Sequence, residues 1–461
     1  MFVNRLRELE FLHKSYNERK PHFIVLYGKR RVGKTELVKQ FFRNTPHIYF
    51  LADKTPEREQ LRSLSEKTGL LFGDDFLVSR GFGTWYEFFA YIKGKGRTIV
   101  VIDEFPFLIE TNRAIPSIFQ KGWEEHLKDS DIFLIILGSS MGMMETEVLG
   151  HKSPLFGRRT AQVLVEPFDF RDAAKFFPGK SVDELIYIYA VVGGVPAYLL
   201  QFDPLLNLWD NIRQKILTPE AYLYDEPEFI LREELREPRN YFAILKAVSM
   251  GKARVSEIIN ETGFEKNVVG KYLSVLTDLR IVRRDVPVTE TIYEKSKKGI
   301  YTVDDNYFKY WFHYVFPNRS FIQEGNIDYV IEKKIKPTLD IFTSQAFEDI
   351  CRDYVRKGRL QGLMFNKTGR WWSKHGEIDV LALHEEEGIM LCGEAKWSIK
   401  KVGIDVLDGL KKKSDSIELK RPVKKRYYAL FSRKGFTDAL KKIAENEKEI
   451  LLVDVPSLAE N

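Results

Sequence analysis

A G-x-x-x-x-G-K-T pattern starts at Gly28 and ends at Thr35, directly after the apolar run 23–27. Its two glycines let the backbone curl, so that successive N–H groups point inward at an anion. In such a loop Lys34 reaches the β- and γ-phosphates of a nucleotide, and the Thr35 hydroxyl holds Mg²⁺. The sequence therefore predicts a site for ATP or ADP with Mg²⁺. The nucleotide-binding residues of this loop are Gly28, Arg31, Val32, Gly33, Lys34, Thr35 and Glu36.

Two acids, Asp103 and Glu104, follow the apolar, β-branched run 98–102. Such a run is typical of a strand buried on both faces of a parallel sheet, and ligands bind at the carboxyl ends of these strands. We expect Asp103 to bind Mg²⁺, directly or through water, and Glu104 to polarise the attacking water. Taken alone, two acids after a strand could instead simply start a turn.

A third apolar run, 131–137, ends in Gly-Ser-Ser. If this strand lies beside the strand of Asp103, Ser139 or its neighbour faces the γ-phosphate and can orient the water. A plain strand-to-loop turn explains these serines equally well. Arg158 and Arg159 follow a later turn, and arginine suits the charge that spreads over a transferring phosphoryl group.

The hydrophobic pattern predicts the elements that position these residues. An amphipathic helix over 7–12 precedes the first strand, and helical spacing over 36–42 places the phosphates at a helix N-terminus. A further strand is expected over 47–51. Arg5, just before the first helix, either approaches the nucleotide or is an ordinary solvated charge.

Several short motifs resemble those of the archaeal ATPase family, within the AAA+ and STAND-like P-loop proteins. They are F-V-N-R, G-K-R-R-V-G-K-T, V-V-I-D-E-F, L-G-S-S, S-P-L-F-G-R-R and G-G-V-P. In that family the G-x-P element lies in the lid helices and contacts the nucleotide. The resemblance implies this role for Gly194 and Pro196, and a finger or sensor role for Arg158 or Arg159. A corner between two helices explains G-G-V-P equally well.

After the expected lid, the pattern indicates three short helices and a hairpin, which is the order of a winged helix. Lys266, Asn267 and Lys271 would lie on or beside its recognition helix. Basic residues are few here, so a DNA-binding wing and a protein-contacting wing both stay open. The aromatic run that follows is better explained by core packing than by base stacking. The ranges are 183–200 and 205–216 for the lid, 241–248, 255–259 and 268–276 for the three helices, 281–287 with 299–303 for the hairpin, and 304–314 for the aromatic run.

The last third of the chain contains a second set of acids. Asp379 lies in a strand that looks buried on both faces, where an ionised carboxylate is costly unless something positive meets it. Glu394 and Lys396 are two residues apart at the end of the next strand, so they point the same way. Two carboxylates that bind Mg²⁺, with a lysine that holds the attacking water, are what a hydrolytic site needs.

This arrangement resembles the PD-(D/E)xK nuclease superfamily, whose first-helix acid would match Glu348. The resemblance implies metal ligation by Glu348, Asp379 and Glu394, and a catalytic role for Lys396. No proline precedes Asp379, which departs from the commonest form of the motif. The alternative is an internal Asp379–Lys396 salt bridge in a degenerate nuclease fold.

The chain has 461 residues, too many for one hydrophobic core. Its net charge of +6 permits nucleic-acid binding without arguing for it. Cys351 and Cys392 lack metal-ligand spacing, which favours a reducing compartment and buried thiols. With no signal pattern and no long apolar segment, we expect a soluble cytoplasmic protein without membrane contact. The predicted domains are 1–170 (P-loop ATPase core), 171–235 (helical lid), 236–325 (winged helix) and 326–461 (nuclease-like domain).

The predicted fold class is α/β: a P-loop parallel sheet with a helical lid, then a winged-helix domain and a restriction-endonuclease-like α/β domain. The functional hypothesis is an ATP-hydrolysing protein whose nucleotide state controls the winged helix and a nuclease-like domain acting on DNA. The alternative is a STAND-like regulatory switch whose inactive nuclease fold binds DNA or protein. ATP and DNA are the expected partners, and a homo-oligomer or a protein partner stays open.

Overall fold

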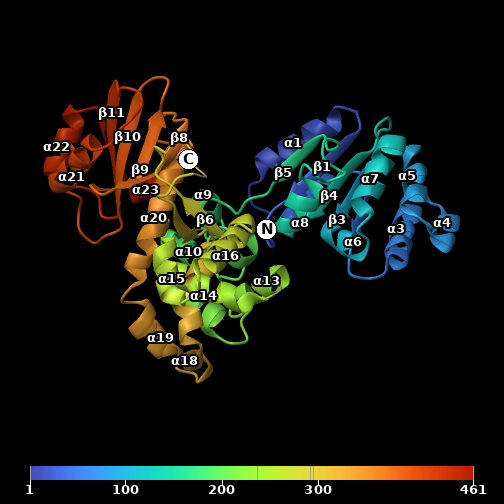
Figure 1. The fold of residues 1–461 in the computed structure, drawn as a ribbon, viewed down its shortest axis with the longest axis horizontal. Coiled ribbons are helices and arrows are strands. Elements are labelled where there is room, and N and C mark those ends of the chain that lie inside the picture. The colour runs from blue at the N-terminus through green and yellow to red at the C-terminus, as the bar shows by residue number, and fades with distance from the viewer. Residues whose placement is uncertain (1, 236, 291, 294, 460–461) are drawn as a thin grey trace. The chain divides into compact units, whose positions relative to one another are not determined.

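The chain folds into two compact units, Met1–Pro167 and Phe168–Asn461, which are blue to teal and green to red in Figure 1. The computed structural model describes residues 2–235, 237–290, 292–293 and 295–459. The boundary at 167 lies close to the predicted end of the nucleotide module. The finer division of the second unit into lid, winged helix and nuclease-like domain stays a prediction.

The first unit is built on a five-stranded sheet with the order β2-β3-β4-β1-β5. All of its strand pairs are parallel, as the α/β prediction requires. The three middle strands are mostly apolar and are buried along their whole length, because helices flank the sheet. The strands are β1 (His22–Tyr27), β2 (His47–Leu51), β3 (Ile99–Asp103), β4 (Phe133–Gly138) and β5 (Ala161–Leu164).

The helices of the first unit connect these strands, and α1 and α2 pack on the sheet through Leu12, Val38 and Phe41. The predicted helices over 7–12 and 36–42 are confirmed, and the first extends further in both directions. The helices are α1 (Leu6–Asn17), α2 (Lys34–Phe42), α3 (Glu57–Phe72), α4 (Asp75–Arg80), α5 (Trp85–Lys93), α6 (Phe105–Thr111), α7 (Ile115–Gly122) and α8 (Met141–Met143), with π-helical turns at Trp123–Leu127 and Met144–Val148.

The second unit begins with the helices predicted as a lid. The expected helix 183–200 is interrupted at Gly193, because the backbone there has a φ of 68° and the next helix starts at Pro196. The carbonyl of Gly194 accepts a hydrogen bond from the N–H of Phe168 at 2.8 Å. The elements are α9 (Phe170–Ala174), α10 (Val182–Val192), α11 (Pro196–Leu199), α12 (Leu208–Asn211), a π-helical turn at Ile212–Leu217 and α13 (Glu226–Glu234).

Three helices and an antiparallel hairpin follow in the order that the sequence predicts. They are α14 (Pro238–Ser249), α15 (Val255–Thr262), α16 (Lys266–Asp278), β6 (Val282–Asp285) and β7 (Ile300–Val303). The aromatic run then forms α17 (Asn306–Tyr310) and the π-helical turn Trp311–Val315, whose large rings are buried. Trp311 Nε1 donates to the Tyr224 carbonyl at 2.5 Å. The preference for core packing over base stacking is therefore confirmed.

The C-terminal part is a five-stranded mixed sheet with the order β12-β11-β10-β9-β8. Strand β9 is antiparallel to both of its neighbours, β8 and β10, while β10, β11 and β12 are parallel. Helix α20 contacts β8, β9 and β10, while α21 packs on β9, β10 and β11 (Figure 1). The strands are β8 (Lys367–Ser373), β9 (Gly376–His384), β10 (Ile389–Lys396), β11 (Lys425–Ser432) and β12 (Ile450–Asp454). The helices are α18 (Arg319–Gln323), α19 (Ile327–Val330), α20 (Leu339–Arg356), α21 (Ile404–Asp415), α22 (Asp438–Asn446) and α23 (Val455–Ala459), with a 3₁₀ turn at Phe316–Asn318 and a π-helical turn at Ile331–Ile335.

Both cysteines are buried free thiols, as predicted. None of the described helices is long and apolar enough to cross a membrane.

Two glycines of the second unit should respond oppositely to alanine. A Cβ on Gly194 would lie 1.8 Å from the Phe168 carbonyl oxygen, so Gly194→Ala should cost about 1–3 kcal/mol of stability. Gly270, inside α16, has no atom within 4 Å of an added Cβ, so Gly270→Ala should gain about 0.5–1 kcal/mol. Urea unfolding of both variants measures this, and equal stabilities would contradict the packing around Gly194.

Candidate functional site

The shape of the loop between β1 and α2 is set by close backbone packing and by a tight turn. An added Cβ at Gly28 would lie 2.3 Å from the Val165 carbonyl oxygen, which leaves no room for a side chain. Arg31 and Gly33 both have positive φ angles, 66° and 89°, which turn the chain tightly before α2. The loop therefore has the curled form that the sequence predicts for an anion cradle.

Lys34 begins α2 and is only 5% exposed. Its Nζ donates to the carbonyl oxygens of Gly28 at 3.0 Å and Lys29 at 2.9 Å, which places the ammonium within the loop. The first N–H groups of α2 and the helix dipole add further positive potential at this position. The cradle thus combines backbone donors with one buried cation.

Thr35 and Asp103 come from segments 68 residues apart and lie in direct contact. Thr35 Oγ1 donates to Asp103 Oδ2 at 2.7 Å, and the Tyr49 hydroxyl donates to the same oxygen at 2.7 Å. Burial and the hydrogen bond to Asp103 raise the pKa of Tyr49, so the phenol stays a donor. A hydroxyl and a carboxylate side by side are oxygen ligands of the kind that Mg²⁺ takes, so these residues fit the predicted ion.

Glu104 directly follows Asp103 in a left-handed backbone conformation, with φ at 51°. This conformation is uncommon for a residue other than glycine and is often found at functional sites. Glu104 Oε1 accepts from Ser139 Oγ at 2.6 Å, because β4 lies next to β3 in the sheet. The strand of Ser139 therefore lies beside the strand of Asp103, which the prediction for Ser139 required. The role of Ser139 in orienting water stays a prediction.

Arg5 is 7% exposed, so its interpretation as a solvated charge is wrong. Its guanidinium donates to the Val32 carbonyl at 2.8 Å and pairs with Glu8 at 3.4 Å. Arg5 thus supports the nucleotide loop from outside. The sequence offered no signal for this contact, because it joins residues that are 27 positions apart.

The remaining predicted nucleotide contacts make other interactions. Glu36 is exposed and lies 3.4 Å from Lys39. Arg158 Nε pairs with Glu124 at 3.2 Å, and Arg159 donates to the Leu149 carbonyl at 3.4 Å. Gly194 and Pro196 belong to the second compact unit. Their roles as nucleotide contacts, and those of the two arginines as finger or sensor, stay predictions.

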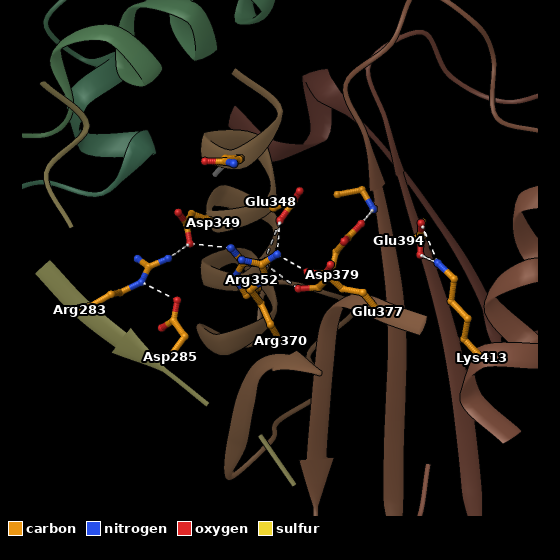
Figure 2. A network of polar contacts seen from close by, with 12 residues as sticks. Arg283, Asp285, Glu348, Asp349, Arg352, Arg370, Glu377, Asp379, Glu394 and Lys413 are labelled. Carbon is orange, nitrogen blue, oxygen red and sulfur yellow. Dashed lines mark hydrogen bonds and ion pairs between the residues drawn. The ribbon is translucent and has the colours of Figure 1, made fainter. Parts of the chain in front are cut away.

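The second set of acids comes from α20, β9 and β10, as Figure 2 shows. Lys396 Nζ lies 2.6 Å from Glu394 Oε1, and Lys413 Nζ lies 3.0 Å from Glu394 Oε2. Asp379 Oδ2 accepts from the N–H of Ala395 at 2.9 Å. Lys396 therefore forms its ion pair with Glu394 and not with Asp379, the partner that the alternative prediction gave it.

The three acids influence one another electrostatically. Burial and the negative charge of Asp379 raise the pKa of Glu348 to about 7. Burial and the charge of Glu394 likewise raise the pKa of Asp379. Within the described part of the chain, however, no group of three or more acidic, histidine or cysteine side chains is arranged to hold a metal ion. The assignment of Glu348, Asp379 and Glu394 as ligands stays a prediction.

Arg352 joins this acidic set to the rest of the unit, and sequence analysis missed it. It is buried on α20 and donates to the Asp379 carbonyl at 2.7 Å and to Asp349 Oδ1 at 2.7 Å. It also lies 3.5 Å from Glu348 Oε2. Asp349 receives a second guanidinium from Arg283 on β6, at 2.7 Å. Although burial opposes ionisation, these two arginines hold the pKa of Asp349 far below its usual range. The only sequence signal was the spacing Glu-Asp-x-x-Arg on one helix.

Comparison with known proteins assigns a family to this chain. Residues 2–202 match a family described as an ATPase domain predominantly from Archaea. An uncharacterized protein of Methanocaldococcus jannaschii is 34% identical over 443 residues, which cover 94% of this chain and 96% of that protein. The chain belongs to the archaeal ATPase family. In this archaeal ATPase, residues 311–406 match a second family, described as archaeal and bacterial proteins of unknown function, and this segment contains the whole second set of acids.

Further relatives are partial or distant. A 44-residue stretch, 10% of this archaeal ATPase, is 61% identical to an uncharacterized ATP-binding protein of M. jannaschii and covers 75% of it. Among solved structures, a Walker-type ATPase of Pyrococcus abyssi has a TM-score of 0.49 and 20% identity, covering 68% of this chain and 96% of that one. The ORC2 protein of Aeropyrum pernix has a TM-score of 0.44 and 12% identity, covering 70% and 96%.

Two arginines on α20 of the archaeal ATPase provide a matched test of the buried charge network. Arg352→Met removes a buried cation from the partly exposed Asp349 and Glu348 and leaves the Asp379 carbonyl without its donor, so it should cost about 1–3 kcal/mol of stability. Arg356 is 59% exposed and lies 3.7 Å from Asp353, so Arg356→Met should change stability by less than about 0.5 kcal/mol. Urea unfolding followed by circular dichroism measures both, and a mild Arg352→Met would show that the network contributes little.

Proposed function

We propose that this archaeal ATPase hydrolyses ATP at the loop 28–35, and that its nucleotide state controls a nuclease-like site in the second unit that acts on DNA. The observation that carries the first part is the contact of Thr35, Asp103, Glu104 and Ser139 at the carboxyl ends of neighbouring strands. The family match supports the ATPase assignment itself.

Each residue of the first site has a specific role in this proposal. The loop N–H groups and Lys34 hold the phosphates, while Thr35 and Asp103 would hold Mg²⁺. A bound Mg²⁺ would supply positive charge that offsets the charge of the phosphates. Glu104 orients the attacking water and takes its proton, and Ser139 fixes the Glu104 carboxylate at 2.6 Å.

The second site rests on the acids of α20, β9 and β10. Burial and the charge of Asp379 raise the pKa of Glu348, and burial and the charge of Glu394 raise the pKa of Asp379, which is a situation that a divalent cation relieves. Lys396 lies at the end of β10, where it would hold the attacking water or the charge that develops on the phosphate. The three helices and hairpin at 238–303 would act as a winged helix that contacts DNA or a protein.

A second candidate function is a nucleotide-driven switch whose nuclease-like domain binds without cutting. The contacts of Glu394 favour it, since two lysines already neutralise this carboxylate without a metal ion. The same domain would then act as a binding module under the control of the ATPase.

A carboxylate-to-amide exchange tests the first site. Glu104→Gln keeps a polar group for Ser139 but cannot take a proton, so the ATPase kcat should fall by about 100-fold or more while ATP still binds. Glu110→Gln, on the exposed end of the following helix, is the matched control and should hydrolyse ATP like the unchanged protein. Phosphate release and calorimetric ATP titration measure both properties. An undiminished kcat for Glu104→Gln would refute its proposed role.

Metal-dependent cleavage separates the two candidate functions. The full chain with Mg²⁺ or Mn²⁺ should cleave DNA, and Asp379→Ala and Lys396→Ala should each abolish cleavage without affecting ATP hydrolysis. Labelled DNA substrates run on denaturing gels, with and without ATP, provide the measurement. Cleavage that survives both substitutions, or no cleavage in any nucleotide state, would remove the nuclease assignment and leave the switch.

A further inference from the structure

A cavity of about 470 Å³ lies within the second unit, between the 238–303 helices and hairpin and the C-terminal sheet. One wall comes from the start of α15, from β7 and from α17, and the other from α20, β8 and β9. Glu348 lines the second wall, so the cavity opens onto the proposed cleavage site. The residues on which the inference depends are Arg254, Tyr301, Lys309, Glu348 and Trp372.

The cavity has more cationic side chains than acidic ones. Arg283, Arg352 and Arg370 are paired with acids that also line the cavity, namely Asp349, Glu348 and Glu377. Two further cations, Arg254 and Lys309, also line the cavity, and within the described residues neither has an ion-pair partner. The lining therefore carries an unbalanced positive charge, which favours an anionic ligand.

Lys309 makes this imbalance costly, because it is only 9% exposed. Its ammonium donates to Gln345 Oε1 and lies 5.6 Å from the Phe342 ring centre, and both partners are uncharged. Burial lowers the pKa of Lys309 to about 8. Asp349 and Glu348 attract this ammonium without forming an ion pair with it, and a phosphate in the cavity would add a direct counter-charge.

Two aromatic side chains complete the lining. Tyr301 on β7 and Trp372 on β8 are both partly exposed within the cavity. Aromatic rings beside a cationic surface are typical of proteins that bind single-stranded nucleic acid, because bases stack on the rings while phosphates meet the cations. The volume falls in the range of about 300–1,000 Å³ that suits a small ligand, which admits a nucleotide or two but not a duplex.

The two walls are joined by specific contacts. Arg283 on β6 pairs with Asp349 on α20 at 2.7 Å, as Figure 2 shows. The N–H of Val288 donates to the Arg370 carbonyl on β8 at 2.9 Å. These bonds fix the separation of the walls, so the cavity has a defined width.

We infer that this cavity binds unpaired nucleotides of a single-stranded nucleic acid, with Arg254 and Lys309 on the phosphates and Tyr301 and Trp372 on the bases. The inference rests on the proposed function, since a strand held there would pass Glu348. It deepens that function by naming an unpaired strand as the substrate. It also gives the 238–303 segment a role as a wall of the substrate site, in place of a separate reader of duplex DNA.

Binding without cleavage tests this inference on the full chain. Fluorescence anisotropy with a labelled dT12 strand in EDTA should show saturable binding. Arg254→Glu, an exposed and therefore tolerant position, should weaken that binding by at least tenfold, as should Lys309→Met. Trp372→Ala should weaken it by about tenfold, the size of effect expected for one lost stacked base. Lys442→Glu reverses an exposed charge on α22, outside the cavity, and should leave binding unchanged.

The controls separate this inference from its rivals. A blunt hairpin duplex that binds as tightly as dT12, or a loss of binding in Lys271→Glu but not in Arg254→Glu, would overturn it in favour of a recognition helix. A labelled rU12 strand tests whether the cavity distinguishes RNA from DNA. Binding of either strand supports the inference if Arg254→Glu weakens that binding. Binding is measured in EDTA, where metal-dependent cleavage cannot occur. If dT12 binds in EDTA but the protein cleaves no DNA with Mg²⁺ or Mn²⁺, only the proposed cleavage is contradicted. Cleavage that is indifferent to Arg254→Glu would contradict only the cavity.

Discussion

The hydrogen bond between Thr35 and Asp103 depends on the strand order of the first sheet. Strands β1 and β3 are separated only by β4, so the loop after β1 and the acids after β3 lie close together at the carboxyl edge of the sheet. The parallel direction of all five strands brings their carboxyl ends to that edge. Tyr49, one strand further out, reaches the same carboxylate oxygen. A single change in strand order would separate the phosphate loop from its acids, whatever the residues were.

The second unit depends on a different constraint, which is the cost of burying charge. Arg283 and Arg352 approach the partly exposed Asp349 from two elements and hold the pKa of its carboxyl far below the usual range. Arg352 also binds the backbone of β9 at Asp379. One guanidinium therefore fixes the helix that carries Glu348 against the strand that carries Asp379.

Much of the fold could be predicted from the sequence, because its strands and helices have strong apolar periodicity. The β2 strand matches its predicted range, and motif chemistry assigned Thr35 and Asp103 to one Mg²⁺ before their direct contact was seen. Contacts between charged side chains could not be predicted in the same way. Periodicity indicates which face is buried, but not which cation meets which acid. For Arg5 the sequence therefore left nucleotide contact and a solvated charge both open, Lys396 was considered as a partner of Asp379, and Arg352 was missed.

The hydrogen bond between Val288 and β8 affects whether two copies of this domain can associate through their sheet edges. Strand β8 is at the edge of its sheet, where unpaired backbone groups could recruit a strand from another chain. The register shifts between Gly369 and Trp371, and at this irregularity the Arg370 carbonyl accepts from Val288. Val288 also covers Gly369, with a side-chain carbon 3.3 Å from where a Cβ would stand. The chain thereby caps part of its own sheet edge, which protects this domain against edge-to-edge aggregation.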